Sequence, residues 1–156
     1  MGIKWNSDEL RLGVEEIDAQ HEEVYARVSE ILGGLRVGRH NEFLELLSCL
    51  ERYFVRHFAT EERLMAESAY PGMGSHMALH RGLLRTCRRH AEVFWEQGGA
   101  TSALIGKVAD WLTTWLGEHL RGADRDLATF LQSSTCQRAG TAPGKWSQPK
   151  RSEARP

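Results

Sequence analysis

Residues 57–80 read HFATEERLMAESAYPGMGSHMALH, and the pattern within them indicates helices. Apolar residues recur every three or four positions on both sides of Pro71-Gly72, which is the spacing of one face of an α-helix. Proline and glycine together interrupt helices, so this segment predicts one helix before the dipeptide and another after it. His76 and His80 lie one turn apart, at positions where core residues are expected.

The same helical spacing extends over most of the chain. We expect helices over residues 17–35, 42–68, 75–97 and from just after Thr101-Ser102 to 131, with Asn41 as the N-cap of the second. The breaks between these helices are short and carry glycine or proline, which favours antiparallel neighbours. The sequence therefore predicts an all-α fold, an antiparallel four-helix bundle with up-down-up-down topology.

The two ends of the chain depart from this pattern. Residues 1–132 are predicted to form the bundle domain, whose N-terminal arm, residues 1–16, packs along the outside through Trp5, Leu10, Leu12 and Val14. Residues 133–156 hold three of the four prolines and five basic residues against Glu153 alone. This composition predicts a basic, disordered tail, with docking to an acidic surface as the alternative.

Composition excludes several classes of protein. Hydrophobic residues make up 41% and charged residues 26% of the 156, and the net charge of −1 gives no reason to expect a nucleic-acid partner. No segment has the roughly 18 consecutive apolar residues that a transmembrane helix needs, and the first residues lead into no apolar signal region. Three widely spaced cysteines indicate no disulfide framework. We therefore expect a cytoplasmic protein without a transmembrane segment.

Ionisable residues interrupt the apolar stripe of each predicted helix. Seven of them occupy inward positions: His21, His57, Glu61, His76, His80, His119 and Asp124. One buried histidine is an ordinary core residue, but burying this many ionisable groups costs free energy unless they are paired, neutralised or coordinated. A metal-free bundle is thus the least favoured hypothesis, and a metal centre is the preferred one.

The spacing of these residues suits coordination. His57 and Glu61, like His76 and His80, are four residues apart and so lie on one helix face. His119 and Asp124 are five apart, about 140° around an ideal helix, so they share a face only if the backbone adjusts. Gly122 lies between them and is the expected place for a bend.

The number and type of ligands favour a dinuclear site. Seven ligands exceed the four of a tetrahedral zinc site, and they leave one position open on two octahedral ions bridged by carboxylates and a solvent oxygen. Imidazole suits several transition metals, whereas carboxylate bridging favours harder ions. The mixture indicates iron, with manganese as the second choice.

Four motifs in this order resemble the signature of hemerythrins, especially bacterial ones, over Trp5 to Leu131. They are IDAQH (17–21), HFATEE (57–62), YPG (70–72) followed by His76 and His80, and WLTTWLGEH (111–119) followed by Asp124. Each motif alone has low specificity. All four together, in the right order and spacing and with every ligand present, are highly specific.

The resemblance implies a ligand assignment. His76, His80 and His119 would hold one iron, His21 and His57 the other, and Glu61 and Asp124 would bridge them together with an oxo or hydroxo group. The second iron, cycling between Fe2+ and Fe3+ with the first, would keep an open position for dioxygen. Trp115 and Leu116 match positions at the oxygen pocket, although both also suit ordinary core packing. His40 and His90 match no ligand and are expected at the surface.

Two functions remain open. The first is reversible dioxygen binding, for oxygen carriage, storage, sensing or delivery to an oxygen-accepting protein partner. The second is a di-iron enzyme, such as a peroxidase, an oxidase or a protein that handles nitric oxide. Di-iron oxidases typically use four carboxylates and two histidines. The predicted set of two carboxylates and five histidines favours the ferrous state, so we expect an oxygen-binding protein and not an enzyme, with peroxidase activity as a side reaction.

Overall fold

The computed structural model describes residues 10–36 and 42–140, and within them it confirms the predicted helical bundle. In chain order the helices are α2 (Glu15–Arg36), α3 (Phe43–Ser68), α4 (Met73–Glu96) and α5 (Ser102–His119). A short π-helix, η2 (Leu120–Asp124), continues α5 without a break into α6 (Arg125–Gly140). These last three elements therefore form the fourth long helix of the bundle.

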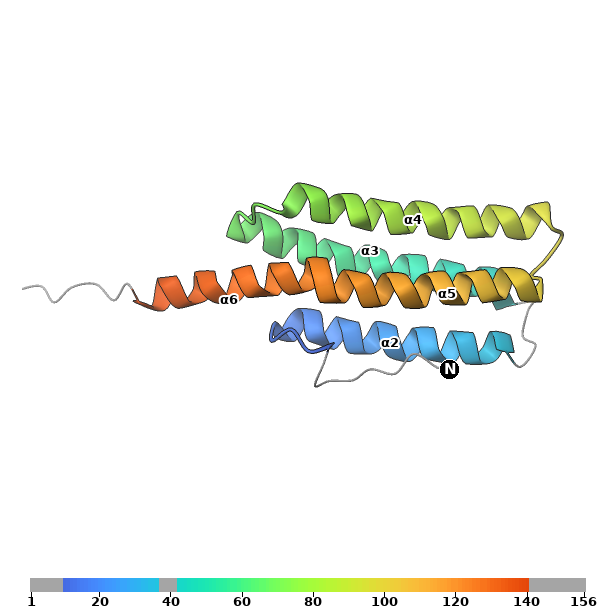
Figure 1. Ribbon diagram of the computed structural model, residues 1–156, viewed down its shortest axis with the longest axis horizontal. Coiled ribbons are helices and arrows are strands. Elements are labelled where there is room, and N and C mark those ends of the chain that lie inside the picture. Colours follow the sequence, from blue (N-terminus) through green and yellow to red (C-terminus); the bar gives the residue numbers. More distant parts are fainter. Residues whose placement is uncertain (1–9, 37–41, 141–156) are drawn as a thin grey trace, which may run out of the picture.

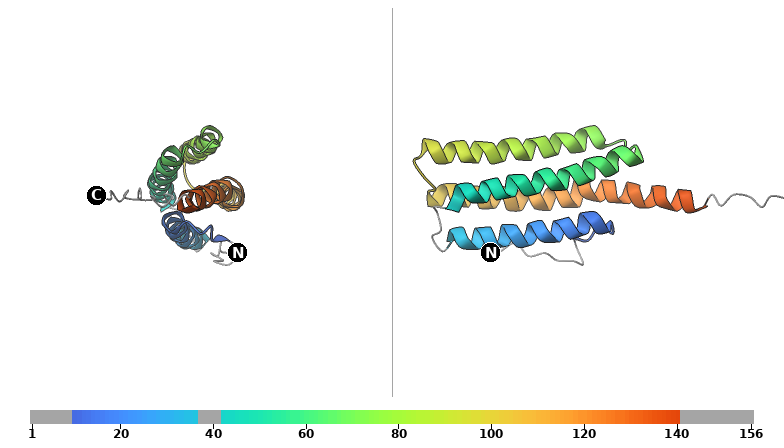
Figure 2. Two further views of the ribbon diagram at one scale, coloured as in Figure 1. Left: turned by 90° about the vertical axis from the view of Figure 1, so that its left-hand side faces the viewer. Right: turned by 180° about the vertical axis from the view of Figure 1, so that it is seen from behind.

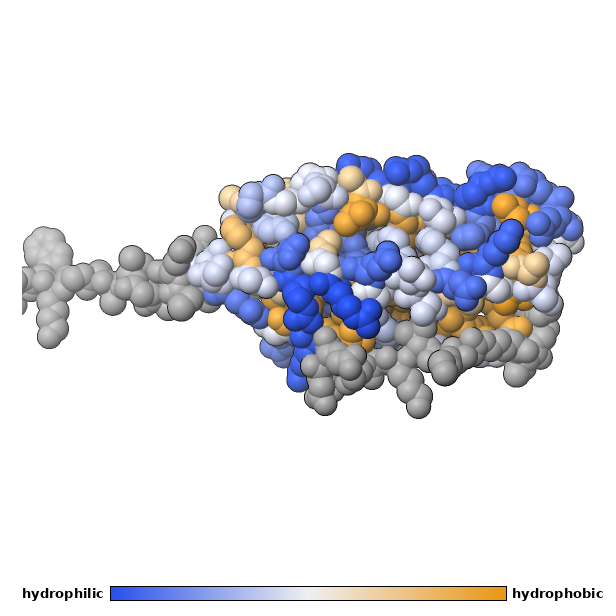
Figure 3. Space-filling model, in the orientation of Figure 1, coloured by the Kyte–Doolittle hydropathy of each residue, from blue (hydrophilic) through white to orange (hydrophobic). Residues whose placement is uncertain are grey.

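Consecutive helices run antiparallel, as predicted (Figure 1). Seen end-on, α3 lies between α2 and α4, and the continuous α5–η2–α6 helix completes the bundle (Figure 2). One face of the molecule is dominated by hydrophilic residues, with apolar residues in separate patches (Figure 3). The apolar faces of the helices are thus turned mainly toward one another.

The turns between helices follow local chemistry. Ala69 ends α3 in the left-handed conformation, with φ 55°, and Tyr70 N donates to Met65 O at 2.9 Å. A Cβ on Gly72 would lie 2.7 Å from the Tyr70 ring, so another residue there would displace this ring. Thr101 Oγ1 accepts from Leu104 N at 3.1 Å and caps α5.

The start of α3 differs slightly from the prediction. The helix begins at Phe43, and Glu42 occupies the N-cap position without a side-chain hydrogen bond to the first turn. Asn41, the predicted cap, lies outside the described residues.

The core consists of two apolar clusters, a large one and a small one. The large cluster includes Val24, Phe54, Leu83, Leu112 and Leu116. The small cluster is formed by Leu12, Ile17, Met65, Leu127 and Ala128. Along every long helix, residues of the two clusters flank the predicted ligands in sequence, as Ile17 and Val24 flank His21. The polar layer is therefore enclosed between apolar layers.

The N-terminal arm packs against the bundle as expected where it is described. Leu10 and Leu12 are buried, and Val14 packs against the small cluster, whereas Trp5 lies outside the described residues. The buried Asp18 carboxylate accepts from Leu12 N at 2.7 Å and from Gly13 N at 2.8 Å. A charged group in α2 thus fixes the arm.

The fourth helix extends further than the predicted end at residue 131, and the domain boundary expected at residue 132 stays a prediction. Helix α6 continues to Gly140, and residues 72–142 contain no proline that would interrupt it. Residues 141–156, the rest of the predicted tail, lie outside the described part. Among the described residues, no helix combines the length and the apolar character that crossing a membrane requires.

Substituting Asp18 tests the anchoring of the arm. We expect Asp18→Ala to lower the free energy of unfolding by about 2 kcal/mol, because the buried Leu12 N–H and the partly buried Gly13 N–H lose their acceptor. Urea unfolding of the metal-free proteins measures the difference, with Glu22→Ala on the exposed face of α2 as the control. Equal effects of the two substitutions would show that the contact does not hold the arm.

Candidate metal centre

The structure brings all seven predicted ligands into one buried layer. Each is at most 6% exposed, and Glu61 is fully buried. They come from all four long helices: His21 from α2, His57 and Glu61 from α3, His76 and His80 from α4, His119 from α5 and Asp124 from η2. Their ligand atoms form two groups, within each of which all atoms lie within 4.8 Å of one another. One group is Glu61, His76, His80 and His119, and the other is His21, His57, Glu61 and Asp124.

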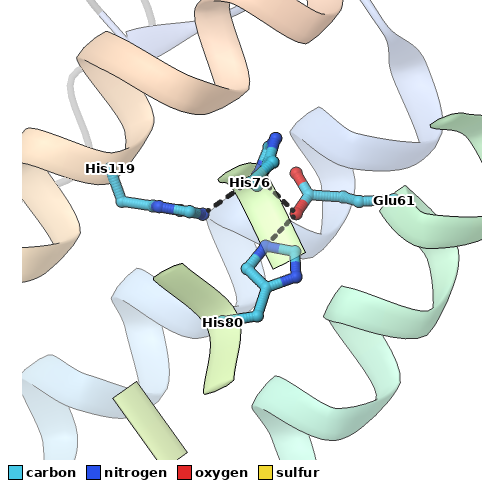
Figure 4. A group of neighbouring side chains, drawn as sticks. All are labelled: Glu61, His76, His80 and His119. Carbon is cyan, nitrogen blue, oxygen red and sulfur yellow. Dashed lines mark hydrogen bonds and ion pairs between the residues drawn. The ribbon is translucent and has the colours of Figure 1, made fainter. Parts of the chain in front are cut away.

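Glu61 lies between the two groups and faces both. Its Oε1 lies 3.6 Å from His57 Nε2. Its Oε2 lies 3.1 Å from His80 Nε2 and 3.6 Å from His76 Nε2 (Figure 4). One carboxylate oxygen thus points toward each set of histidines.

Asp124 repeats this arrangement from the opposite helix. Its Oδ2 lies 3.2 Å from His21 Nε2, whereas its Oδ1 lies 3.0 Å from His119 Nε2 and 3.1 Å from His76 Nε2. Two carboxylates that each span the two histidine sets are the arrangement that bridging two cations requires.

The π-helix η2 explains how His119 and Asp124 meet. In a π-helix the hydrogen bond joins residues five apart, so side chains with this spacing lie on nearly the same face. The predicted adjustment is therefore an inserted π turn. Gly122 lies within it, but its φ is not in the left-handed region and a Cβ there would meet nothing within 4 Å. The backbone thus departs from a regular α-helix around Gly122, as predicted, although nothing in the local geometry requires a glycine there.

Burial and mutual contact shift the pKa values of the cluster. Burial lowers the pKa of His57 to about 4. Burial and Asp124 raise the pKa of Glu61, but the nearby histidines outweigh them and lower it to about 2. Burial also raises the pKa of Asp124, but its contacts with histidines outweigh this effect and hold the pKa well below its usual range.

His76 shows the opposite shift. Burial lowers its pKa, but Asp124 and Glu61 outweigh this effect and raise it to about 9. The metal-free site therefore keeps ionised carboxylates and holds a proton on His76 near neutral pH. A bound cation would take the place of such protons.

The buried polar atoms fit a metal better than they fit one another. His76 Nε2 and His119 Nε2 face each other at 3.2 Å, and both also lie within 3.1 Å of Asp124 Oδ1, so three potential ligand atoms converge on one place. Neither Glu61 oxygen has a well-formed hydrogen bond from the described residues, despite full burial. Buried polar groups without hydrogen-bond partners indicate a site for a cation or a water molecule.

Aromatic rings surround the ligands. Phe58 stacks on His80 with ring centroids 3.7 Å apart, and Trp115 stacks on His119 at 4.2 Å. A small cavity is lined by Trp115 and Leu116, the two predicted pocket residues, and by His21, Val24, Tyr25, Phe54, His57, His119, Leu120 and Asp124. The volume of this cavity is about 10 Å³. A cavity of this size holds at most one molecule about as large as water.

Comparison with known proteins agrees with this geometry. Residues 12–131 match the family model described as the hemerythrin HHE cation binding domain. The chain belongs to the hemerythrin family. Bacteriohemerythrin of Stenotrophomonas maltophilia (strain R551-3) is 30% identical over 130 residues, covering 81% of this chain and 80% of its own. Bacteriohemerythrin of Pseudomonas aeruginosa (strain LESB58) is 26% identical over 127 residues, with the same two coverages.

Solved hemerythrins share the fold. A crystal structure of wild-type hemerythrin superposes with a TM-score of 0.67 at 25% identity, covering 82% of this chain and 96% of that one. A hemerythrin mutant gives a TM-score of 0.68 at 24% identity, covering 84% and 98%. The resemblance inferred from the four sequence motifs is thereby confirmed for this hemerythrin-family chain.

The remaining histidines stand apart from the centre. His90 belongs to neither ligand group, but the prediction that it lies at the surface is wrong. It is partly buried against Trp111, with ring centroids 4.9 Å apart, because α4 and α5 pack together there. His40 lies outside the described residues.

Sequence reasoning missed three polar residues that contact the ligand histidines or their partners. Gln20 Oε1 lies 2.9 Å from His57 Nδ1, and Gln20 Nε2 donates to Thr60 Oγ1 at 3.0 Å. Glu62 Oε1 lies 3.2 Å from His80 Nδ1. The available signal was position: Gln20 and Glu62 each adjoin a predicted ligand in the quoted motifs.

Substitution of Gly122 tests the origin of the π turn. We expect Gly122→Ala to leave metal uptake unchanged and to raise the free energy of unfolding by about 0.5–1 kcal/mol, because alanine loses less backbone entropy in a helix. Gly72→Ala, whose Cβ would contact the Tyr70 ring, is the contrasting variant and should be less stable than the wild type. Loss of metal uptake in Gly122→Ala would show that the turn depends on glycine.

Proposed function

We propose that this hemerythrin-family chain holds two iron ions and binds dioxygen reversibly at one of them. His76, His80 and His119 would hold the first ion, His21 and His57 the second, and Glu61 and Asp124 would bridge them. The observation that carries the proposal is that each carboxylate directs one oxygen to each histidine set. Imidazole and carboxylate ligands together suit iron.

The unequal ligand sets support an open position on the second ion. That half offers two histidines where the other offers three. The cavity is lined by both histidines of this half, His21 and His57, and by His119 of the other half, so a small ligand in it would have access to the ion with fewer protein ligands. When bound, the iron pair supplies the electrons that dioxygen binding requires.

Residues around the cavity would protect bound dioxygen from water. Trp115 and Leu116 provide apolar walls that limit the entry of water, and the low pKa of His57 leaves its imidazole neutral and able to coordinate. The cavity also has too little room for an organic substrate. These features favour reversible binding over the enzymatic alternative, and binding of this kind serves oxygen carriage, storage, sensing or delivery to an oxygen-accepting protein.

Exposure of the reduced, iron-loaded protein to air tests this proposal. We expect a ligand-to-iron charge-transfer band in the visible that disappears under vacuum and returns with air over several cycles. The zinc-loaded protein is the matched control, because Zn2+ has no redox chemistry and should give no band. Bleaching without recovery would favour the enzymatic function instead.

Removal of single histidines tests the ligand assignment. We expect His119→Ala, loaded anaerobically and desalted, to keep about half of the wild-type iron, because one half of the centre loses a ligand. His90→Ala removes a partly buried imidazole that belongs to neither ligand group and should keep all of the iron. Iron content per chain measures both, and equal losses would contradict the assignment.

A further inference from the structure

The outer nitrogens of two ligand histidines meet chemically different groups. His57 Nδ1 faces the neutral amide of Gln20 at 2.9 Å, whereas His80 Nδ1 faces the carboxylate of Glu62 at 3.2 Å. His57 belongs to the half with two histidines, and His80 to the half with three. The surroundings of the two halves therefore differ in charge as well as in ligand number.

A chain of hydrogen bonds fixes the orientation of the Gln20 amide. Thr60 Oγ1 donates its proton to Arg56 O, at 3.4 Å, and is left to accept from Gln20 Nε2 at 3.0 Å. The amide nitrogen of Gln20 thus faces Thr60, and its oxygen faces His57. An amide oxygen only accepts, so His57 Nδ1 carries the proton and its Nε2 presents the lone pair toward the centre.

Glu62 has the corresponding contact on the other half, with a negative charge. A carboxylate that accepts from the outer nitrogen of a ligand histidine fixes the ring and makes its other nitrogen a stronger donor to metal. Phe58 stacks on the same His80 ring at 3.7 Å and limits its rotation. Nδ1 of His76 and of His119 has no hydrogen-bond partner among the described residues, so no comparable carboxylate contact is found on them.

We propose that Glu62 and the Thr60–Gln20 pair are positioning residues that make the two halves of the centre unequal. Glu62 strengthens the half of His76, His80 and His119, which takes up the first divalent ion. Thr60 and Gln20 hold His57 ready with a neutral contact, so the second ion binds more weakly at the half beside the cavity. This inference rests on the proposed two-ion centre, and it assigns an order of loading and a cause for it.

Titration of the metal-free protein with Co2+ alone, followed by calorimetry and visible absorption, tests the proposal. The wild type should take up two equivalents in two resolved steps. Glu62→Gln keeps the shape of the side chain, removes its charge, and should weaken the first step by about 10- to 100-fold. Thr60→Val removes the acceptor that orients Gln20 and should weaken the second step, while Thr60→Ser should restore it.

Matched controls separate positioning from general damage. Glu67→Gln alters an exposed carboxylate on the same helix, and Thr113→Val removes an exposed hydroxyl bonded to the carbonyl one turn earlier in α5. Both should leave the two steps unchanged, and urea unfolding of all metal-free variants reports whether folding is intact.

The outcomes distinguish this inference from the function it rests on. A wild-type protein that binds fewer than two Co2+ ions overturns the two-ion centre itself. If the wild type binds two ions but Glu62→Gln and Thr60→Val change the same step, or change neither by more than about twofold, only the positioning roles are overturned. Selective loss of one step in each variant, with intact folding, supports them.

Discussion

The burial of five histidines and two carboxylates in one layer is the constraint on which the rest of the molecule depends. Apolar clusters flank this layer along every helix, so water cannot solvate the charges. The raised pKa of His76 and the lowered pKa values of Glu61 and Asp124 show that charges of opposite sign stabilise one another there. The two divalent cations of the proposed centre would convert this costly arrangement into binding free energy and tie the four helices together.

The second requirement is that all ligands reach the layer, and regular helices alone do not meet it. A spacing of four residues, about one turn of a regular helix, suffices for His57 with Glu61 and for His76 with His80. Asp124 reaches His119 only through the π turn, an insertion that shifts the register of α6 relative to α5. The shift leaves Leu127 and Ala128 in the small apolar cluster, so the core continues beyond the insertion.

Periodicity predicted the parts of the structure that repeat, namely the four helices and the seven inward positions, because a buried ligand interrupts an otherwise apolar stripe. Periodicity did not predict the features that depend on the detailed sequence of one segment or on contacts between helices. Residues 133–156 were treated as one tail by their average composition, although residues 72–142 contain no proline, so the full extent of α6 was missed. The partial burial of His90 depends on Trp111 from another helix. The Thr60–Gln20–His57 contacts join two helices and leave no periodic signal.

Anomalous X-ray diffraction at the iron absorption edge, from crystals of the iron-loaded protein, tests the central claim most directly. Two peaks are expected, roughly 3.5–4 Å apart, one among His76, His80 and His119 and the other beside His21 and His57. Glu61 and Asp124 should lie between them. A single peak, or peaks outside this layer, would contradict a dinuclear centre built from these seven side chains.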